Sequence, residues 1–247
     1  MWPFPSKSTL ESAGIFQGFT DWHSHILPGV DDGIPDMKSA LQVLERYEQL
    51  GIREVWLTPH IMEDIPNATT ALRQRFDELL SVYAGPLTLH LAAEYMLDAG
   101  FEERLNNDDL LCIGSTNNKT LLVETSYFSP PMDLYSTIAH ISERGYQPLL
   151  AHPERYIYMD SSDYQRLREM EVRFQCNITS LTGVYGKDAC RKFENFLDKG
   201  WIQVLGTDIH RLKSFNLAVA RKCLSDKQKA MLGEIGLQYF QIHNDPL

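Results

Sequence analysis

The chain has 247 residues, 43% hydrophobic and 23% charged, a composition typical of a globular protein with a sizeable core. Its formal net charge of −10 disfavours a broad nucleic-acid surface, because binding a phosphate backbone depends on clustered Lys and Arg. No apolar run approaches the roughly 20 residues of a membrane-spanning helix and the first residues lack the regions of an export signal, so we expect a cytoplasmic protein without membrane insertion.

Short apolar runs alternate with longer amphipathic ones from Phe19 onward, which is typical of repeated βα units around a mainly parallel sheet. Residues 1–18 lack this period and are expected to form an arm, with residues 19–247 as a single domain. The strands predicted are Phe19–His23, Glu54–Thr58, Leu87–Ala93, Thr120–Glu124, Pro148–Ala151, Arg173–Asn177 and Gln203–Gly206. The helices predicted between and after them lie near Asp36–Leu50, Thr69–Tyr83, Glu102–Asn106, Met132–Arg144, Ser162–Met170, Lys187–Lys199 and Asn216–Cys223.

This order of elements predicts an α/β fold of the TIM-like type, a distorted (β/α)7 barrel. In such a barrel the loops that follow the carboxyl ends of the strands share one rim. The residues at the strand ends therefore decide what chemistry the rim can support.

The first predicted strand ends in two alternating histidines, His23 and His25, whose imidazoles project from the same face of an extended chain. A Pro-Gly turn follows, so Asp31 and Asp32 can fold back and bring an oxygen ligand to the same place. An isolated His-x-His is more often a pair of surface histidines on a solvated loop. The metal interpretation therefore depends on the other strands.

Most of the other predicted strands also end in an imidazole or a carboxylate. Together with Asp32, nine such groups are expected on the rim: His23, His25, Asp32, His60, Glu94, Glu124, His152, Asp208 and His210. Carboxylates buried together without cations would repel one another and lose solvation. Mixed nitrogen and oxygen donors without cysteine favour zinc, manganese or iron over calcium and over a structural zinc site. Nine donors are enough for two or three ions.

Three divalent ions would contribute +6 against −4 from the four carboxylates in this set, so the loaded rim would be net positive. Such a rim attracts a phosphate dianion and lowers the pKa of bound water towards ~7. Arg155 lies three residues after His152 and can grip phosphate oxygens with two donors. An ion pair with Glu154 or Asp160 is the alternative use of this arginine.

The remaining candidate residues predict no chemistry. The cysteines form no C-x-x-C pair, and none has an arginine six positions later as in the cysteine phosphatases, so reduced thiols are expected at Cys112, Cys176, Cys190 and Cys223. A structural role is expected for His90, and ordinary roles for His140 and His243.

The combined motifs resemble the polymerase-and-histidinol-phosphatase (PHP) superfamily: His23-x-His25, Asp32, Thr58-Pro-His60, Glu94, Glu124, His152-Pro-Glu-Arg155 and Asp208-x-His210. Within it the chain is similar to the bacterial manganese-dependent protein-tyrosine phosphatases of capsule and exopolysaccharide biosynthesis. The stretches that carry this similarity are His25–Gly33, His152–Tyr156 and Asn177–Gly186. The resemblance implies the PHP type of distorted (β/α)7 barrel and a centre of three divalent ions, usually Mn²⁺, with Fe, Zn or Mg as alternatives.

The resemblance also implies how the donors are shared among the ions. One ion would be held by His23, His25, Glu94 and Asp208, a second by Glu94, Glu124 and His152, and a third by Asp32, His60 and His210. Arg155 would bind the substrate phosphate, and Arg155, Asp208 and His210 would serve catalysis. The family's second phosphate arginine is Arg211, replaced by Lys213, or missing.

The implied activity is hydrolysis of phosphotyrosine by attack of a metal-bridging hydroxide. The implied partner is a phosphotyrosine protein, a bacterial tyrosine kinase tail that controls capsule or exopolysaccharide synthesis. A small-molecule phosphatase, for instance one for histidinol phosphate, would use the same centre. An exonuclease is disfavoured by the acidic charge. The alternative of another class is a metal-binding regulatory module without catalysis, and the sequence favours no particular oligomeric state.

Overall fold

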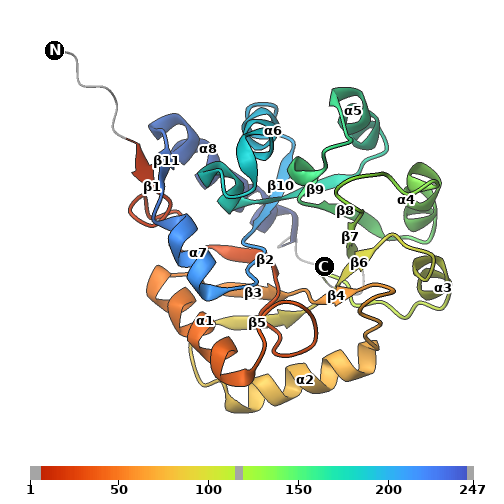
Figure 1. The fold of residues 1–247 in the computed structure, drawn as a ribbon, viewed down its shortest axis with the longest axis horizontal. Helices are drawn as coiled ribbons and strands as arrows, with labels where there is room; N and C mark the ends of the chain where they lie inside the picture. Colours follow the sequence, from red (N-terminus) through yellow and green to blue (C-terminus); the bar gives the residue numbers. More distant parts are fainter. Residues whose placement is uncertain (1–6, 115–118, 244–247) are drawn as a thin grey trace.

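The computed structural model describes residues 7–114 and 119–243, which form a mixed α/β fold (Figure 1). Residues 1–6 of the expected arm lie outside the described residues. The strands are β1 Ser8–Thr9, β2 Thr20–Ser24, β3 Glu54–Leu57, β4 His60–Ile61, β5 Thr88–Leu91, β6 Glu94–Met96, β7 Thr120–Glu124, β8 Gln147–Ala151, β9 Arg173–Asn177, β10 Ile202–Gly206 and β11 Lys222–Leu224. The α-helices are α1 Met37–Leu50, α2 Thr69–Val82, α3 Phe101–Asn106, α4 Leu134–Glu143, α5 Ser161–Glu169, α6 Gly186–Asp198, α7 Leu212–Val219 and α8 Asp226–His243, with short 3-10 helices η1 Pro153–Arg155 and η2 Ile178–Thr182.

Two parallel sheets carry most of the strands. Six strands pair in the order β10-β9-β8-β7-β6-β4 and three in the order β2-β3-β5, while β1 and β11 form a separate antiparallel pair. All seven strands predicted from the sequence are present, which confirms a mainly parallel α/β fold. Within the described residues, the strand ladders do not join into one closed ring.

The break between the two sheets has a local cause. Thr58 and Pro59 separate β3 from β4, and Ala92 and Ala93 separate β5 from β6. Each of these two runs of chain therefore contributes one strand to the three-stranded sheet and the next strand to the six-stranded sheet. Pro59 has no N–H to donate to a ladder, which favours an interruption at this position.

Helix α1 has clear sequence signals for its start, its end and its buried face. The side chain of Asp36 accepts a hydrogen bond from the N–H of Ser39 and begins the helix, and Gly51, with φ of 84°, ends it. The apolar residues between them recur at helical spacing and are buried, including Val43, Leu44 and Tyr47. The helix therefore packs its apolar face against the strands.

The strands bury side chains on both faces. The larger core lies between strands and helices, and a smaller cluster that includes Trp56, Leu122 and Val204 is separate from it. Trp22 stacks on Trp56 with ring centroids 5.9 Å apart, and His90 stacks on the same indole at 4.5 Å. The structural role expected for His90 is therefore confirmed.

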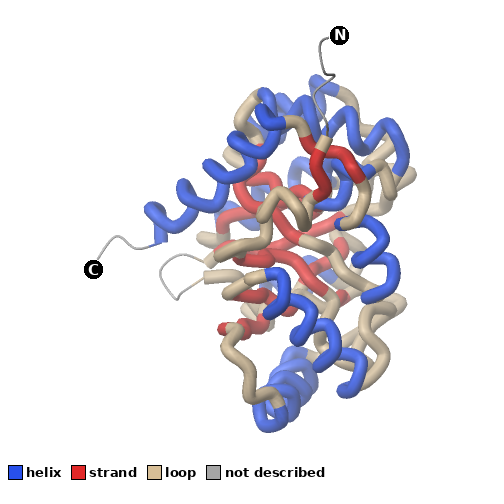
Figure 2. Tube along the Cα trace, turned by 90° about the vertical axis from the view of Figure 1, so that its left-hand side faces the viewer, coloured by secondary structure: helices blue, strands red, loops and turns tan. Residues whose placement is uncertain are grey.

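The chain after β10 differs from the sequence prediction. The helix expected near residues 216–223 ends at Val219, and residues 222–224 form β11, which pairs with β1 near the start of the chain. Such a pairing over long sequence separation has no local signal. Helix α8, which was not predicted, stands out from one side of the strands in Figure 2. No helix among the described residues is long and apolar enough to cross a membrane.

Candidate metal centre

All nine candidate ligands lie together at one edge of the sheets, where β2, β7, β8 and β10 end and where His60 and Glu94 begin β4 and β6 shortly after the ends of β3 and β5. His23, His60, Glu94 and Glu124 belong to β2, β4, β6 and β7, and the others follow β2, β8 or β10 within a few residues: His25, Asp32, His152, Asp208 and His210. Asp32 is exposed and His210 is half-buried, whereas the other seven side chains are buried. The predicted convergence on one rim is therefore present.

Glu94 lies at the middle of the cluster and is fully buried. Its Oε2 atom is 3.2 Å from Nε2 of His23, 3.3 Å from Nε2 of His25 and 3.1 Å from Nδ1 of His60. Its Oε1 atom is 3.0 Å from Nε2 of His152. Four imidazoles thus surround one carboxylate that has no access to solvent.

The donors form three overlapping groups whose ligand atoms lie within 4.8 Å of one another: His23, His25 and Glu94; His60, Glu94 and Glu124; and His25, Asp32, His60 and His210. Because the groups share His25, His60 and Glu94, they form one continuous site with room for more than one ion. His152 and Asp208 border these groups. Oδ1 of Asp208 is 3.4 Å from Nε2 of His25 and 3.4 Å from Nδ1 of His210.

Several buried polar atoms of the cluster lack a hydrogen-bond partner in the protein, among them Nδ1 of His60, Oε2 of Glu94 and Oε1 of Glu124. Nδ1 of His60 lies 3.1 Å from Oε2 of Glu94 and 3.0 Å from Oε1 of Glu124 without the geometry of a hydrogen bond. Unsatisfied buried donors and acceptors of this kind are costly unless a further group completes them. Their convergence fits divalent cations.

The electrostatics of the cluster favour bound positive charge. Although burial acts in the opposite direction, His23 and His60 hold the pKa of the Glu94 carboxyl well below its ordinary value. The His210 side chain lowers the pKa of Asp32 to about 2. Buried carboxylates that remain ionised need positive charge beside them, which protonated imidazoles or bound cations can supply.

A second layer of polar side chains orients the imidazoles and carboxylates. Asp31 accepts from Nδ1 of His25 at 2.8 Å, and Oε1 of Gln175 lies 2.7 Å from Nδ1 of His23. Asn177 donates from Nδ2 to Oδ2 of Asp208 at 2.7 Å. Sequence reasoning considered Asp31 with Asp32 as a source of an oxygen ligand, did not foresee its bond to His25, and missed the other two residues. A signal existed, because Gln175 and Asn177 alternate along an otherwise buried strand.

Two candidate ligands that follow strands have unusual backbone dihedral angles. His152 has φ of 34° and Asp208 has φ of 52°, both in the left-handed region that residues other than glycine rarely occupy. Gly206 lies so close to β2 that a Cβ atom there would be 2.5 Å from Cβ of His23. Rare backbone conformations often cluster at functional sites.

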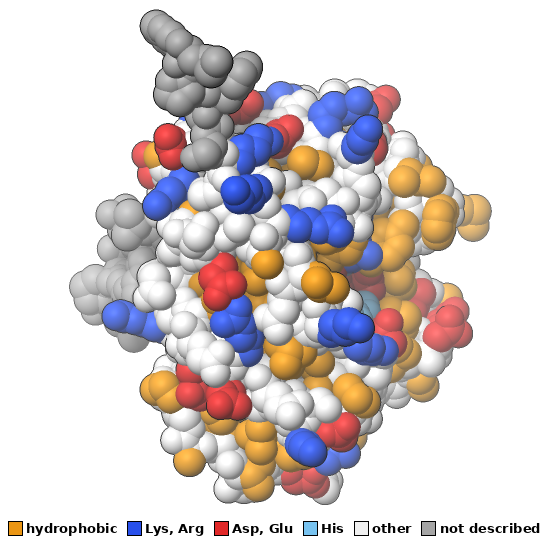
Figure 3. All heavy atoms as spheres, turned by 60° about the vertical axis from the view of Figure 1, so that its left-hand side comes forward, with side chains coloured by type: hydrophobic (Ala, Val, Ile, Leu, Met, Phe, Trp, Pro, Cys, Tyr) orange, Lys and Arg blue, Asp and Glu red, His pale blue; other side chains and the backbone are white. Residues whose placement is uncertain are grey.

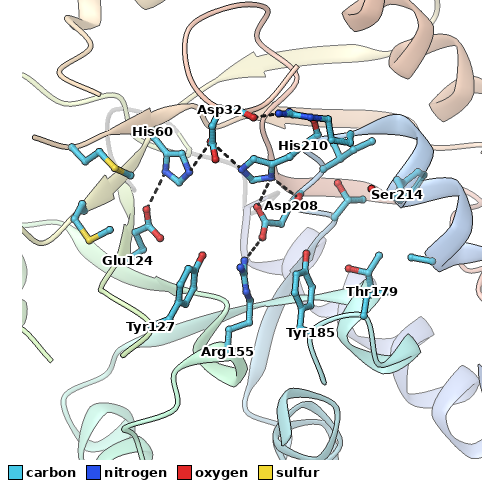
Figure 4. A pocket seen from close by; sticks show the side chains of 18 residues that line it. Asp32, His60, Glu124, Tyr127, Arg155, Thr179, Tyr185, Asp208, His210 and Ser214 are labelled. Atoms are coloured by element: carbon cyan, nitrogen blue, oxygen red, sulfur yellow. Dashed lines mark hydrogen bonds and ion pairs between the residues drawn. The ribbon is translucent and has the colours of Figure 1, made fainter. Parts of the chain in front are cut away.

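A cavity of about 790 Å³ opens beside the cluster, and Figure 4 shows Asp32, His60, Glu124, Asp208 and His210 facing it. No cysteine is among the described residues that line it, and all four cysteines are free thiols, as expected. The cavity places the donor cluster within reach of a ligand from solvent.

Arg155 enters the cavity between two aromatic rings. Its guanidinium carbon lies 4.3 Å from the ring centroid of Tyr127 and 4.3 Å from that of Tyr185, and Nη1 donates to Oδ2 of Asp208 at 2.6 Å. The alternative pairing with Glu154 is wrong, because that carboxylate accepts from Asn177 N and Ser180 Oγ instead. The side chain of Asp160 caps helix α5. The two tyrosines were not singled out from the sequence.

Arg211 also lines the cavity, but its Nη1 is engaged by the backbone. It donates to the carbonyl oxygens of Asp32 at 2.6 Å, Gly33 at 2.5 Å and His210 at 2.7 Å. Arg211 thus ties the Asp32 loop to the segment after β10. Lys213 is exposed and is not among the described residues that line the cavity.

The sequence is similar to one protein family and to several known proteins. The family described as "Capsular polysaccharide synthesis, CpsB/CapC" matches residues 19–242. The tyrosine-protein phosphatase YwqE of Bacillus subtilis is 28% identical over 202 residues, 79% of each chain. The tyrosine-protein phosphatase CpsB of Streptococcus pneumoniae is 27% identical over 210 residues, 78% of this chain and 84% of the relative.

A solved structure shares the fold. It belongs to a study of YwqE from Bacillus subtilis and CpsB from Streptococcus pneumoniae, described as unique metal-dependent tyrosine phosphatases. The match has a TM-score of 0.70 and 25% sequence identity, and it covers 90% of this chain and 95% of that one.

Proposed function

The chain belongs to the CpsB/CapC family of capsular polysaccharide synthesis, and from this premise we propose that it is a metal-dependent protein-tyrosine phosphatase. The observation that carries the proposal is the buried cluster of His and carboxylate donors at the edge of a cavity that also contains an arginine. A metal centre beside a guanidinium is suited to a phosphate ester.

We propose that the nine predicted ligands hold three divalent ions, and that the ions are Mn²⁺. The shared positions of His25, His60 and Glu94 support a multinuclear site. Mixed imidazole and carboxylate donors without thiolate suit manganese or iron. When bound, such ions act as Lewis acids towards phosphoryl oxygens and activate water at neutral pH.

We assign Arg155 to the phosphate of the substrate. Burial lowers its pKa, but the adjacent Asp208 carboxylate raises it above its ordinary value, so the guanidinium stays charged. Among the described residues only Nη1 of this guanidinium has a hydrogen-bond partner, and the tyrosine rings on either side hold the plane of the group. Its other donors can grip two phosphate oxygens. Asp208, which accepts from this arginine, and His210, which lies 3.4 Å from Asp208, are the other candidates for catalysis.

Arg211 remains a candidate for a second phosphate contact because it lines the cavity and has donors beyond Nη1. Its three bonds to carbonyl oxygens support an additional role in holding Asp32 in place. The leaving group of the reaction, a phenol with a pKa near ~10, departs more readily than an alkoxide and needs less help from a proton donor.

The partner we propose is a tyrosine-phosphorylated protein, in particular a bacterial tyrosine kinase that controls capsule or exopolysaccharide synthesis. The family's description and the tyrosine-protein phosphatases among the relatives support this proposal.

We also propose that the two parallel sheets form a distorted (β/α)7 barrel. The interruptions Thr58-Pro59 and Ala92-Ala93 are short enough for β3–β4 and β5–β6 each to count as one strand of the barrel. Contact between the first and last strands is supported by the Asp208 N–H, which donates to the carbonyl oxygen of His23 at 2.8 Å.

The division into an arm, residues 1–18, and a domain, residues 19–247, also remains a proposal. Its support is that β1 pairs at the edge with β11, apart from the parallel sheets. Leu10 and Phe16 are buried in the main core, so the arm would be packed firmly on the domain.

The test compares hydrolysis of a phosphotyrosyl peptide with that of histidinol phosphate by the Mn²⁺-loaded protein. We expect a higher kcat/KM for the peptide and loss of phosphate release with a chelator. Asp208→Ala and His152→Ala should abolish activity, whereas His140→Ala, whose imidazole pairs with Glu102 away from the cavity, should not. Preference for histidinol phosphate would favour the small-molecule alternative. Activity that survives the first two substitutions would contradict the metal centre.

A further inference from the structure

Large apolar side chains are exposed on the same side of the molecule as the cavity. Seven described residues of this kind are exposed, and four of them lie in loops that follow β7, β8 and β9. These four, which we call the apolar rim, are Phe128 at 76% exposure, Met132 at 101%, Ile157 at 64% and Val184 at 40%. Since loops after parallel strands share one rim, the four belong to the end of the fold that carries the metal ligands.

The apolar rim is continuous with the wall of the cavity. Val184 lines the cavity itself, and Phe128 directly follows Tyr127, whose ring contacts Arg155. The N–H of Ile157 donates to the carbonyl oxygen of Tyr127 at 3.0 Å, which ties the second loop to the first. A ligand bound through Arg155 would therefore lie beside the loops that carry these side chains.

The other side of the cavity mouth has a different character. Asp32 is exposed after β2, and Glu63 and Asp64 are exposed after β4. In Figure 3 orange apolar side chains gather at the upper right, above the hollow where pale blue histidine is visible, with charged side chains beside it. The mouth thus offers an apolar half and a charged half to anything that enters.

Exposed apolar side chains grouped beside a binding cavity mark surfaces that a partner covers. We propose that the apolar rim binds hydrophobic side chains that flank the phosphotyrosine of a polypeptide substrate. The inference rests on the proposed function. We assign a peptide substrate to the apolar rim because the rim is continuous with the cavity that contains Arg155. A phosphotyrosine seated against Arg155 leaves its neighbouring residues over Phe128 and Ile157.

The test uses the full-length Mn²⁺-loaded protein and a double substitution, Phe128→Ser with Ile157→Ser, of residues that do not line the cavity. The matched control is Leu80→Ser with Val82→Ser, which removes two exposed apolar side chains from the end of α2. The substrates are a phosphotyrosyl peptide with leucine on both sides of the phosphotyrosine, the same peptide with serine there, and p-nitrophenyl phosphate.

We expect the rim substitutions to raise KM for the leucine peptide about tenfold, since each covered side chain contributes to binding by hydrophobic burial. The KM for the serine peptide and kcat/KM for p-nitrophenyl phosphate should stay within about twofold of the wild type. The control substitutions should change none of the three. Equal changes for both peptides, or none for either, would overturn the role of the apolar rim.

Other occupants give distinct results. If a second copy of the chain covers the rim, sedimentation will show that the wild type is a dimer and that the rim variant is a monomer. The wild type will then have the same KM for the leucine and serine peptides. If a membrane covers it, the wild type will sediment with phosphatidylglycerol vesicles and the rim variant will not, again without a peptide preference. Either result overturns the proposal. Failure of the wild type to hydrolyse any phosphotyrosyl peptide would instead contradict the proposed function.

Discussion

Three imidazoles of the candidate metal centre each have an oxygen partner at Nδ1. Asp31 fixes His25, Gln175 fixes His23, and the carbonyl oxygen of Asp208 lies 3.0 Å from Nδ1 of His210. A partner on Nδ1 sets the tautomer, so that Nε2 presents its lone pair to a cation. The orientation of these ligands therefore depends on Asp31 and Gln175, which are not candidate ligands, and on the backbone of Asp208.

Asp31 offers the sharpest test at this scale because its carboxylate serves two ligands. Oδ2 accepts from Nδ1 of His25 at 2.8 Å and from the N–H of His60 at 3.1 Å. We expect Asp31→Ala to weaken Mn²⁺ binding by about 10- to 100-fold, since loss of such partners frees the ligating imidazole. Equilibrium dialysis with metal analysis measures this directly.

The matched control is Asp36→Ala in the same segment. Asp36 caps helix α1 and touches no candidate ligand, so its loss should cost about 1 kcal/mol of unfolding free energy without changing Mn²⁺ affinity. Unchanged affinity in Asp31→Ala would show that His25 is oriented by packing alone.

Sequence reasoning found the ligands better than their partners. Most of the ligands lie in or shortly after one of the strands predicted from the sequence, so the pattern repeats along the chain and can be read without a structure. Gln175 and Asn177 lie in β9, which carries none of the predicted ligands, and Tyr127 and Tyr185 follow strands with no repeated spacing. Their role depends on which strands become neighbours, and that is decided by the tertiary fold.

At the scale of elements, strand register brings the ligands to one level. His60 pairs with Glu94 across β4 and β6, and Gly206 pairs with Asn177 across β10 and β9. A shift of one residue in any ladder would turn ligand side chains to the opposite face. The same ladders that stabilise the sheet therefore also set the geometry of the centre.

Gly206 tests how closely the first and last of these strands must approach. A Cβ atom there would lie 2.5 Å from Cβ of His23 and 2.8 Å from Nε2 of Gln175, so β10 would have to move. We expect Gly206→Ala to cost about 1–3 kcal/mol in urea unfolding and to lower the number of bound Mn²⁺ ions.

A glycine in helix α8 provides the comparison. Gly233 has open space where its Cβ would be, so Gly233→Ala should leave stability unchanged or raise it by up to about 1 kcal/mol. If Gly206→Ala unfolds at the same urea concentration as the wild type, the close contact between β10 and β2 is not a constraint on the fold.

The elements that the sequence predicted are those with strong local patterns. All seven predicted strands and the helices α1 to α6 appear within a few residues of their expected bounds. β1 and β11 are only two and three residues long and pair across most of the chain, so neither has a period of its own. Of the two interruptions, Thr58-Pro59 has a local signal in its proline, whereas Ala92-Ala93 has none.

For the whole molecule, the stability of the fold and the loading of the site are linked. Glu94, Glu124 and Asp208 are nearly inaccessible to solvent and lie within one cluster of imidazoles. The fold brings these charges together, and the unfolded chain separates them. Cations that bind only the folded cluster therefore stabilise it, by about 2.7 kcal/mol for each site when the free ion is at 100 times its Kd.

Removal of the ions should consequently lower the urea midpoint of unfolding as well as the activity. We expect EDTA to shift the midpoint of the wild type downward, and added Mn²⁺ to restore it, with unfolding followed by circular dichroism. Glu94→Gln replaces the carboxylate that contacts four imidazoles with a neutral amide, which weakens ion binding. EDTA should therefore shift the urea midpoint of this variant much less than that of the wild type. Equal midpoints for the wild type with and without EDTA would contradict the linkage, because a buried anionic cluster that needs no cations for stability would have to be neutralised by protons instead.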